Sequence, residues 1–310
     1  KGMKVYQDIV LNHTGNFGET NLLPMFEKDE TMLDTADCLQ ILPDSGLPDN
    51  YAEMTPGNQY QARLALMKEA ELDVNNIYHH QKSLNWDDYT CQTAQIAGDC
   101  VDLNTENPKV AEYLRNCYIN YINMGVDAFR IDTMKHISRL TMNKEFIPQF
   151  KAAGGDNFFM FGEGCVLRNE VWNDNKPAIS VPFYTWKESK DYGWRSDKTL
   201  EATLHNEAAA FQLYEDQTVG NQPVSDNAFL KGNEYHKPDY SQFSGMGMID
   251  FYMHHNFESA SNAFGKALEE DKYFNDSTWS VTYVDSHDYG PNASSLYQRY
   301  TGSQAAWAEN

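Results

Sequence analysis

Three carboxylic acids, Asp132, Glu163 and Asp288, each stand at or just beyond the end of a short apolar run that is typical of a buried strand. Moving a charged carboxylate from water into a buried position costs several kcal/mol unless the group is paired. A single such acid is often a structural ion pair or a helix cap. Three of them after successive strands indicate an active site.

The surroundings of these acids suit glycoside cleavage. Arg130 shares a strand face with Asp132, because alternate residues of a strand point the same way, and it holds that carboxylate ionised as a nucleophile requires. Glu163 ends a nearly all-apolar strand, where desolvation raises the pKa of a carboxyl and keeps a general acid protonated. Retaining glycosidases use such a pair about 5–5.5 Å apart. Asp288, beside His287, would stabilise positive charge on the sugar.

The acids need a scaffold that brings strand ends together, and the chain has the pattern of one. Short apolar segments alternate with amphipathic segments, which predicts parallel βα units. The expected strands are residues 5–10, 126–131, 158–162, 246–251 and 281–284, and the expected helices are 108–123, 143–153 and 257–270.

Two long polar and aromatic stretches, 14–97 and 184–243, interrupt this alternation and predict elaborated loops or an inserted subdomain. The remainder gives roughly 33 residues per strand unit, near the roughly 31 of a (β/α)8 TIM-type barrel. The alternative is a doubly wound sheet, which would carry a glycine-rich phosphate turn after its first strand. Residues 11–16 do not form one, so we predict an α/β barrel that is incomplete in this chain.

The amino-acid composition excludes several classes of binding partner. The net charge of −21 argues against nucleic acid and anionic membrane surfaces, and a neutral substrate fits better. No apolar run is long enough to predict a membrane span. The 19 tyrosines and 6 tryptophans suit either sugar stacking or core packing. The five cysteines lack paired metal-ligand spacing; of these, Cys91 and Cys100 could close a short loop, whereas Cys117 and Cys165 are expected to be buried thiols.

The run Tyr78-His79-His80 suggests zinc, but adjacent histidines on a loop point apart. We therefore expect these histidines to be solvated or to contact sugar. Trp86 and Tyr89 could stack on sugars at outer subsites or pack within the insertion.

Five segments, in order, resemble the signature regions of the α-amylase family, glycoside hydrolase family 13, and the resemblance runs from residue 1 to about residue 291. They are Asp8-Ile-Val-Leu-Asn-His13, Val101-Asp-Leu-Asn-Thr-Glu-Asn-Pro108, Gly125-Val-Asp-Ala-Phe-Arg-Ile-Asp-Thr-Met-Lys-His136, Gly162-Glu163 and Tyr283-Val-Asp-Ser-His-Asp288.

The resemblance implies a role for each matching residue. Asp132 would be the nucleophile that forms a covalent glycosyl intermediate, Glu163 the general acid/base, and Asp288 the stabiliser of the transition state. Lys135-His136 resembles amylases that cut α-1,4 bonds in starch-like glucans or maltooligosaccharides. The implied substrate-binding residues are His13, Arg130, Lys135, His136 and His287. Asp8 would support the fold.

The resemblance also implies a structural calcium ion held by Asn12, Asp102 and the carbonyl of His136. Asn12 and Asp102 are hard oxygen donors of the kind that calcium prefers. Alternatively, the two side chains bond backbone groups in turns.

In family terms, residues 5–10 would be barrel strand three and residues 281–284 strand seven, with strands one, two and eight missing. Residues 1–13 and 98–310 would form the barrel portion, with a long loop insertion at about 184–243, and residues 14–97 would form the inserted domain.

Because the second strand normally supplies an aromatic residue that stacks on the cleaved sugar, we expect residues 1–310 alone to be weak or inactive. We expect an extracellular or cell-surface location, and no signal is visible in a chain that opens inside a strand.

Three departures from the family pattern, Gly164, Ser286 and Val101, concern subsite shape rather than the catalytic groups. Two other functions stay open. A cyclodextrin-forming transglycosylase shares every motif named above. A non-catalytic glucan-binding relative would typically have lost the acids, all of which are present here.

Overall fold

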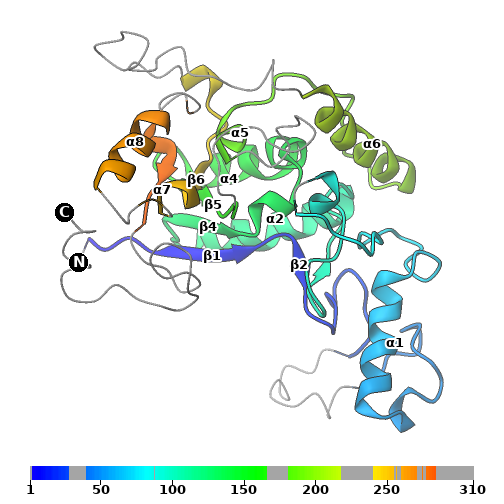
Figure 1. Cartoon of the computed structure of the whole chain (residues 1–310). Helices are drawn as coiled ribbons and strands as arrows, with labels where there is room; N and C mark the ends of the chain where they lie inside the picture. The colour runs from blue at the N-terminus through cyan, green and yellow to red at the C-terminus, as the bar shows by residue number, and fades with distance from the viewer. Residues whose placement is uncertain are drawn as a thin grey trace, which may run out of the picture.

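The computed structural model contains a five-stranded parallel sheet with helices packed beside it (Figure 1). It describes residues 2–27, 40–86, 88–165, 181–217, 240–254, 256, 260–270, 274 and 277–283. All five predicted strands are present, as β1 (Tyr6–Val10), β4 (Ala128–Asp132), β5 (Phe159–Gly162), β6 (Gly247–Ile249) and β7 (Ser280–Val281).

The sheet grows in one direction along the chain, in the order β1-β4-β5-β6-β7, and each strand is parallel to its neighbours. A doubly wound sheet reverses its strand order at a switch point. The described strands show no such reversal, which favours the barrel interpretation over the doubly wound alternative. The prediction of a parallel α/β fold is confirmed.

The predicted helices are largely present. Helix α2 (Pro108–Asn123) has the predicted bounds, because Asn107 caps its start and Pro108 occupies the first turn. In place of one helix over 143–153, a π-helical turn (Met142–Phe146) leads into α4 (Ile147–Gly154). Helix α8 (Ala260–Glu270) falls within the third predicted range.

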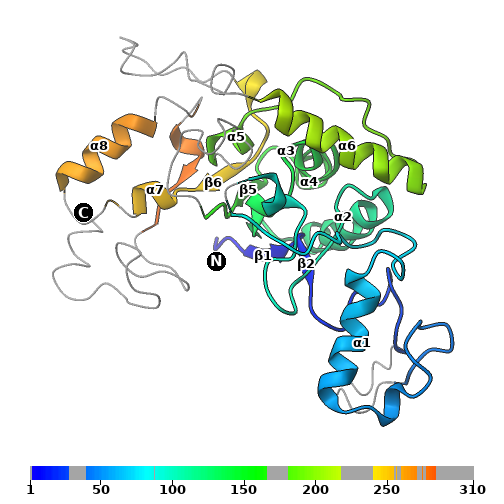
Figure 2. The ribbon, with the colours of Figure 1, turned by 45° about the vertical axis from the view of Figure 1, so that its right-hand side comes forward.

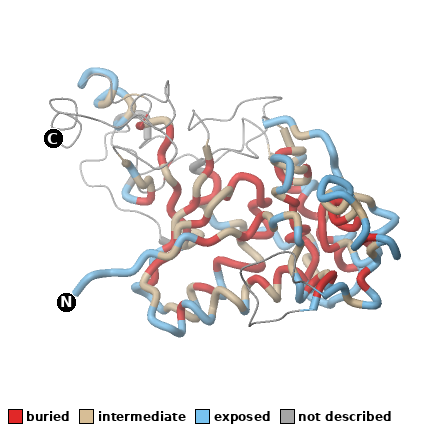
Figure 3. Tube along the Cα trace, turned by 90° about the horizontal axis from the view of Figure 1, so that it is seen from below, coloured by how far each residue is buried: buried red, intermediate tan, exposed pale blue. Residues whose placement is uncertain are grey.

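One face of the sheet is buried under these helices. Phe129 of β4 contacts Phe150 of α4 and Phe158, with ring centroids 5.3 and 5.0 Å apart. Figure 3 shows the buried residues concentrated toward the middle of the molecule, with exposed residues around its periphery. The opposite face carries Arg130 and is more open, since Tyr6 is 57% exposed and Phe159 is 36% exposed.

The stretch 184–243, predicted as a long loop insertion, contains a 17-residue helix, α6 (Leu200–Asp216), which follows α5 (Val181–Thr185). Thr199 caps α6, and Ala209 and Leu213 pack against Leu140. No sequence pattern predicted this helix, because its six buried residues are three alanines, Thr203, Asn206 and a single leucine, which give a weak periodic signal.

The stretch 14–97 carries helix α1 (Pro56–Lys68), which stands apart from the sheet at one end of the molecule (Figures 1 and 2). A short antiparallel pair, β2 (His13–Thr14) with β3 (Val101–Asp102), lies where this stretch begins and ends. Met67 of α1 and Ile9 of β1 belong to one continuous hydrophobic core. The division into two domains stays a prediction.

Residue 79 contradicts the expectation of a solvated or sugar-contacting histidine. His79 is buried, with Nδ1 2.6 Å from Asp102 Oδ2 and Nε2 3.0 Å from Glu106 Oε2. Burial works against the charge of the ring, but the two carboxylates outweigh it and raise the pKa of His79 to about 10. His80 pairs separately with Asp73, at 3.2 Å. His79 is buried rather than solvated because two buried carboxylates, Asp102 and Glu106, require a cation between them.

Within the described ranges, no three histidine, cysteine or acidic side chains are grouped as metal ligands. The four cysteines of these ranges form no disulfide with one another, including Cys91 and Cys100, which were candidates for a short bridge. No helix of the described chain combines the length and the apolar character needed to cross a bilayer.

Replacing His79 tests its buried ion pairs. We expect His79→Leu to lower the free energy of unfolding by about 3–5 kcal/mol, because it leaves Asp102 and Glu106 buried without a cation. Urea unfolding at pH 7 measures the effect. The matched control is His205→Leu, since His205 is exposed and contacts only the Gly193 carbonyl among the contacts described; it should change stability by about 0.5 kcal/mol or less. Equal stability of the two variants would contradict a buried ion pair.

Gly162 gives a second test. A Cβ atom there would lie 2.6 Å from Met134 Cγ and 3.0 Å from Met248 Sδ, so the strand end that leads to Glu163 has no room for a side chain. We expect Gly162→Ala to cost about 1–3 kcal/mol of stability through overpacking. Gly57→Ala in α1 is the control, because a Cβ there meets nothing within 4 Å. Similar melting temperatures for both variants would show that the close packing at Gly162 is unimportant.

Candidate active site

The ends of β4 and β5 bring Asp132 and Glu163 together. The register pairs Ile131 with Gly162, so the next residue of each strand lies at the same level. The Glu163 N–H donates to the Ile131 carbonyl at 2.8 Å, which fixes this level. The Asp132 side chain is 25% exposed and that of Glu163 is 13% exposed. The two acids therefore share a site at the carboxyl edge of the sheet that is partly closed to water.

The Arg130 guanidinium contacts three carboxylates. Its Nη1 lies 2.5 Å from Asp132 Oδ1 and 3.0 Å from Asp8 Oδ1, and its Nη2 lies 3.3 Å from Glu163 Oε2. The contact with Asp132 is the pairing expected from the strand face that the two residues share. The contact with Glu163 was not predicted, because nothing in a single strand shows what the neighbouring strand brings alongside. Asp8 contacts this arginine and no other residue of the site.

The surroundings of Glu163 shift its pKa upward, in the direction that favours the protonated form. Burial is the largest influence and raises the pKa of Glu163, and the nearby charge of Asp132 acts in the same direction. Arg130 and the Thr133 N–H, which donates to Glu163 Oε2 at 3.2 Å, act in the opposite direction without cancelling the effect. The pKa of Glu163 is therefore raised, for the reason given by its apolar strand.

Three further predicted residues lie around this pair. Burial lowers the pKa of His13, partly opposed by Asp132. Burial also lowers the pKa of His136 to about 4, so its ring is neutral, and its Nδ1 lies 2.6 Å from the Cys91 carbonyl oxygen. Lys135 Nζ donates to the Cys165 carbonyl at 3.0 Å, on the segment that follows Glu163.

The stretch 14–97 supplies an aromatic side chain beside these residues. Trp86 is 48% exposed. Its ring meets His136 edge-on at 5.4 Å, and Lys135 Nζ lies 4.9 Å from its centroid. Tyr89 instead packs against Phe211 and Tyr214 of α6, so its ring is packed, but against a helix outside the stretch 14–97 rather than within that stretch.

The sequence analysis missed two buried side chains that hold the segment carrying Lys135 and His136. Gln92 Nε2 donates to the Tyr184 hydroxyl at 2.9 Å and to the Lys135 carbonyl at 3.3 Å. The Tyr184 hydroxyl donates to the Ile137 carbonyl at 2.8 Å. Both residues lie in irregular or short elements far from Lys135 in sequence, so no spacing signal identifies them.

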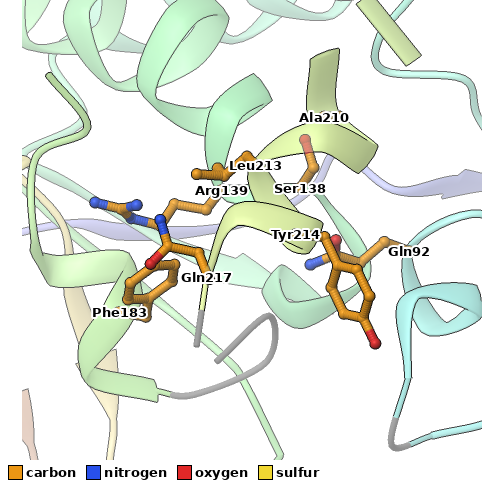
Figure 4. Close-up of a pocket in the computed structure, with 8 residues that line it drawn as sticks. All are labelled: Gln92, Ser138, Arg139, Phe183, Ala210, Leu213, Tyr214 and Gln217. Carbon is orange, nitrogen blue, oxygen red and sulfur yellow. The ribbon is translucent and has the colours of Figure 1, made fainter. Parts of the chain in front are cut away.

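A pocket lies next to the segment that carries Lys135 and His136 (Figure 4). Its polar groups are engaged elsewhere, since Arg139 pairs with Glu188 at 2.7 Å and Ser138 donates to Glu106. Neither Asp132 nor Glu163 lines it, and we assign it no catalytic role. The lining residues are Gln92, Ser138, Arg139, Phe183, Ala210, Leu213, Tyr214 and Gln217.

The structure places Asn12 and Asp102, two of the predicted calcium ligands, side by side and buried. The Asn12 side-chain amide donates to Asp102 Oδ1 at 2.7 Å. A 180° flip of that amide would exchange its nitrogen and oxygen and present the oxygen to a cation. Burial raises the pKa of Asp102 to about 6, so a nearby cation would stabilise its charged form. Because Asp102 Oδ2 already pairs with His79, these residues fit calcium only as part of a set completed by carbonyls and water.

Asp288 and His287 lie outside the described residues, as does Ser286. The described site thus unites Asp132, Glu163 and Arg130, with the other predicted residues of β2 and of the segment after β4 close by. The position of Asp288, the third predicted acid, therefore stays a prediction.

Comparison with known proteins identifies the family. The family model for the alpha amylase catalytic domain matches residues 1–306. The α-amylase of Streptomyces lividans is 24% identical over 299 residues, which cover 89% of this chain and 30% of that protein. A cyclomaltodextrin glucanotransferase of Klebsiella oxytoca is 34% identical over 133 residues, which cover 41% of this chain and 20% of that protein.

Among solved structures, the cyclomaltodextrin glucanotransferase CldA superposes with a TM-score of 0.49 at 16% identity, covering 94% of this chain and 42% of that one. The chain spans less than half the length of each of these relatives. The family model nevertheless covers almost all of the chain, and the chain belongs to the α-amylase family, glycoside hydrolase family 13.

Proposed function

We propose that the chain is the catalytic portion of a retaining glycoside hydrolase that cleaves α-1,4-glucosidic bonds in starch-like glucans or maltooligosaccharides. One observation carries this proposal. Two carboxyl groups lie on adjacent strand ends, bridged by Arg130, and burial raises the pKa of Glu163. Family membership supports the α-glucan substrate.

In the proposed reaction Glu163 donates its proton to the glycosidic oxygen as the bond to the anomeric carbon breaks. An oxygen of Asp132 forms a bond to that carbon, which gives a covalent glycosyl–enzyme intermediate. Glu163, now ionised, takes a proton from water as the water attacks the same carbon and releases Asp132. Asp288 would stabilise the positive charge that develops on the sugar in both steps.

Substrate binding is proposed for His13, Arg130, Lys135, His136 and His287. The neutral ring of His136 and the ammonium group of Lys135 are suited to sugar hydroxyls, which accept and donate hydrogen bonds. The exposed Trp86 ring beside them supports a further stacking contact.

We also propose that β1, β4, β5, β6 and β7 are strands three to seven of a (β/α)8 barrel. Their parallel, sequential order supports this. The exposure of Tyr6 and Phe159 supports it as well, because a closed barrel would bury the sheet face on which these side chains lie.

A transglycosylase is the second candidate. Cyclomaltodextrin glucanotransferases are among the relatives, and an exposed aromatic ring beside Lys135 would help to bind a sugar acceptor in place of water. Chromatography of the products separates the two functions, since hydrolysis yields linear sugars and transglycosylation yields cyclic or lengthened ones. The presence of all three acids argues against a purely glucan-binding protein.

Replacing the acids in the full-length protein tests catalysis. We expect Asp132→Asn and Glu163→Gln each to lower kcat on maltooligosaccharides by about 1,000-fold or more, because each removes a group that takes part in bond making or proton transfer. Asp127→Asn is the control, since Asp127 lies before the same strand and its side chain pairs, within the described part of the chain, with Lys4 and the Val5 N–H alone; it should change kcat about twofold at most.

A fluorinated glycosyl fluoride, which traps a covalent intermediate, should label the peptide that carries Asp132, as peptide mass measurement would detect. Activity that survives replacement of either acid would refute the assignment.

Calcium is proposed to stabilise the fold through Asn12, Asp102 and the His136 carbonyl. We expect a chelator to lower the Tm of the wild-type protein and excess calcium to restore it, because a ligand that binds only the folded state stabilises that state. Asp102→Asn should lower the starting Tm and remove the response to chelator. Magnesium should not substitute, given its stricter octahedral geometry. A wild-type Tm that is indifferent to chelation would exclude a stabilising calcium ion.

A further inference from the structure

The residue after the proposed nucleophile has an unusual backbone. Thr133 has φ 50° and ψ 33°, in the left-handed region. A β-branched residue rarely adopts this conformation, which costs about 1–3 kcal/mol and persists only where surrounding contacts impose it. Thr133 lies between Asp132, at the end of β4, and the 3-10 turn Met134–His136.

The contacts that impose this conformation involve the Thr133 backbone. Its N–H donates to Glu163 Oε2 at 3.2 Å, and its carbonyl accepts the His136 N–H at 3.0 Å. A single residue therefore connects the end of β4, the proposed acid/base on the neighbouring strand and the turn that carries Lys135 and His136.

The side chain of Thr133 does not account for the conformation. Asparagine and aspartate are favoured in the left-handed region because their side chains bond the local backbone. The Thr133 hydroxyl is buried, and within the described residues it has no hydrogen-bond partner. The backbone contacts must offset the strain.

We propose that Thr133 is a positioning residue of the catalytic pair: its left-handed backbone directs the N–H at Glu163 and holds that carboxyl group beside Asp132. This inference rests on the proposed function. Among the residues that the structure describes, the charged groups around Glu163 are Arg130 and Asp132 on β4, and Arg130 also contacts Asp8 on β1. Arg130 contributes charge attraction, and the Thr133 N–H contributes a directed hydrogen bond that fixes one carboxyl oxygen.

The hydrogen bond also affects proton affinity. A donor to the charged form of a carboxyl lowers its pKa. Burial raises the pKa of Glu163, and the Thr133 N–H is one of the groups that limit this rise. Loss of the N–H bond should therefore raise the pKa of Glu163 further and shift the basic limb of the kcat/KM profile to higher pH, because the acid must be protonated to act.

The first test needs no catalysis. In the chain labelled with nitrogen-15 threonine, we expect the Thr133 amide proton to titrate with the same midpoint as the Glu163 carboxyl, and this titration to disappear in Glu163→Gln. The Thr141 amide is the control, since it donates at 3.1 Å to the neutral Ser138 hydroxyl and should not follow Glu163. A Thr133 amide that ignores Glu163 overturns the inference.

The second test uses variants of the full-length protein. Thr133→Asn retains the N–H and favours the left-handed backbone, so kcat and the pH profile should stay within about threefold of wild type. Thr133→Pro cannot adopt φ 50° and has no N–H. We expect it to lower kcat about tenfold or more and to shift the basic limb upward.

A folded Thr133→Pro protein with a wild-type profile would overturn the inference, and so would large losses in Thr133→Asn. If Thr133→Pro fails to fold, the amide titration and Thr133→Asn decide the question. If Asp132→Asn abolishes activity while Thr133 proves indifferent, the proposed function stands and this inference alone fails.

Discussion

The contact of one guanidinium group with three carboxylates is the constraint on which the rest of the site depends. Burial works against the charge of Arg130, but Glu163, Asp132 and Asp8 outweigh it and raise the pKa of Arg130. The arginine thus remains a cation that joins β1, β4 and β5 on the open face of the sheet. Without it, acids of like charge on adjacent strand ends would repel one another in a chain whose net charge is already −21.

The stretch 14–97 contributes to the candidate site. His79 pairs with Asp102 and Glu106, Gln92 donates to the carbonyls of Lys135 and Ile137, and the Cys91 carbonyl contacts the His136 ring. The stretch and the sheet also share one hydrophobic core. Lys135 and His136 therefore owe their positions to contacts from a distant part of the chain as well as to the strand that precedes them.

The features of the fold that depend on local sequence patterns were predicted from the sequence. The bounds of α2 follow from Asn107 and Pro108, and the five strands follow from short apolar runs. Glu163 and Asp132 meet because adjacent parallel strands end at one edge. Tertiary contacts could not be predicted this way. Nothing near His79 in sequence shows that Asp102 and Glu106 surround it, and the left-handed backbone of Thr133 depends on Glu163, a residue of another strand.

The placement of Trp86 has an optical consequence. Its indole is about half exposed and otherwise lies against an ammonium group and an imidazole ring, those of Lys135 and His136, for which we propose sugar binding. Indole emission responds to the polarity around the ring and to nearby charge. A sugar bound at the proposed site would displace water from this ring and change the emission, so the fluorescence of Trp86 would report binding.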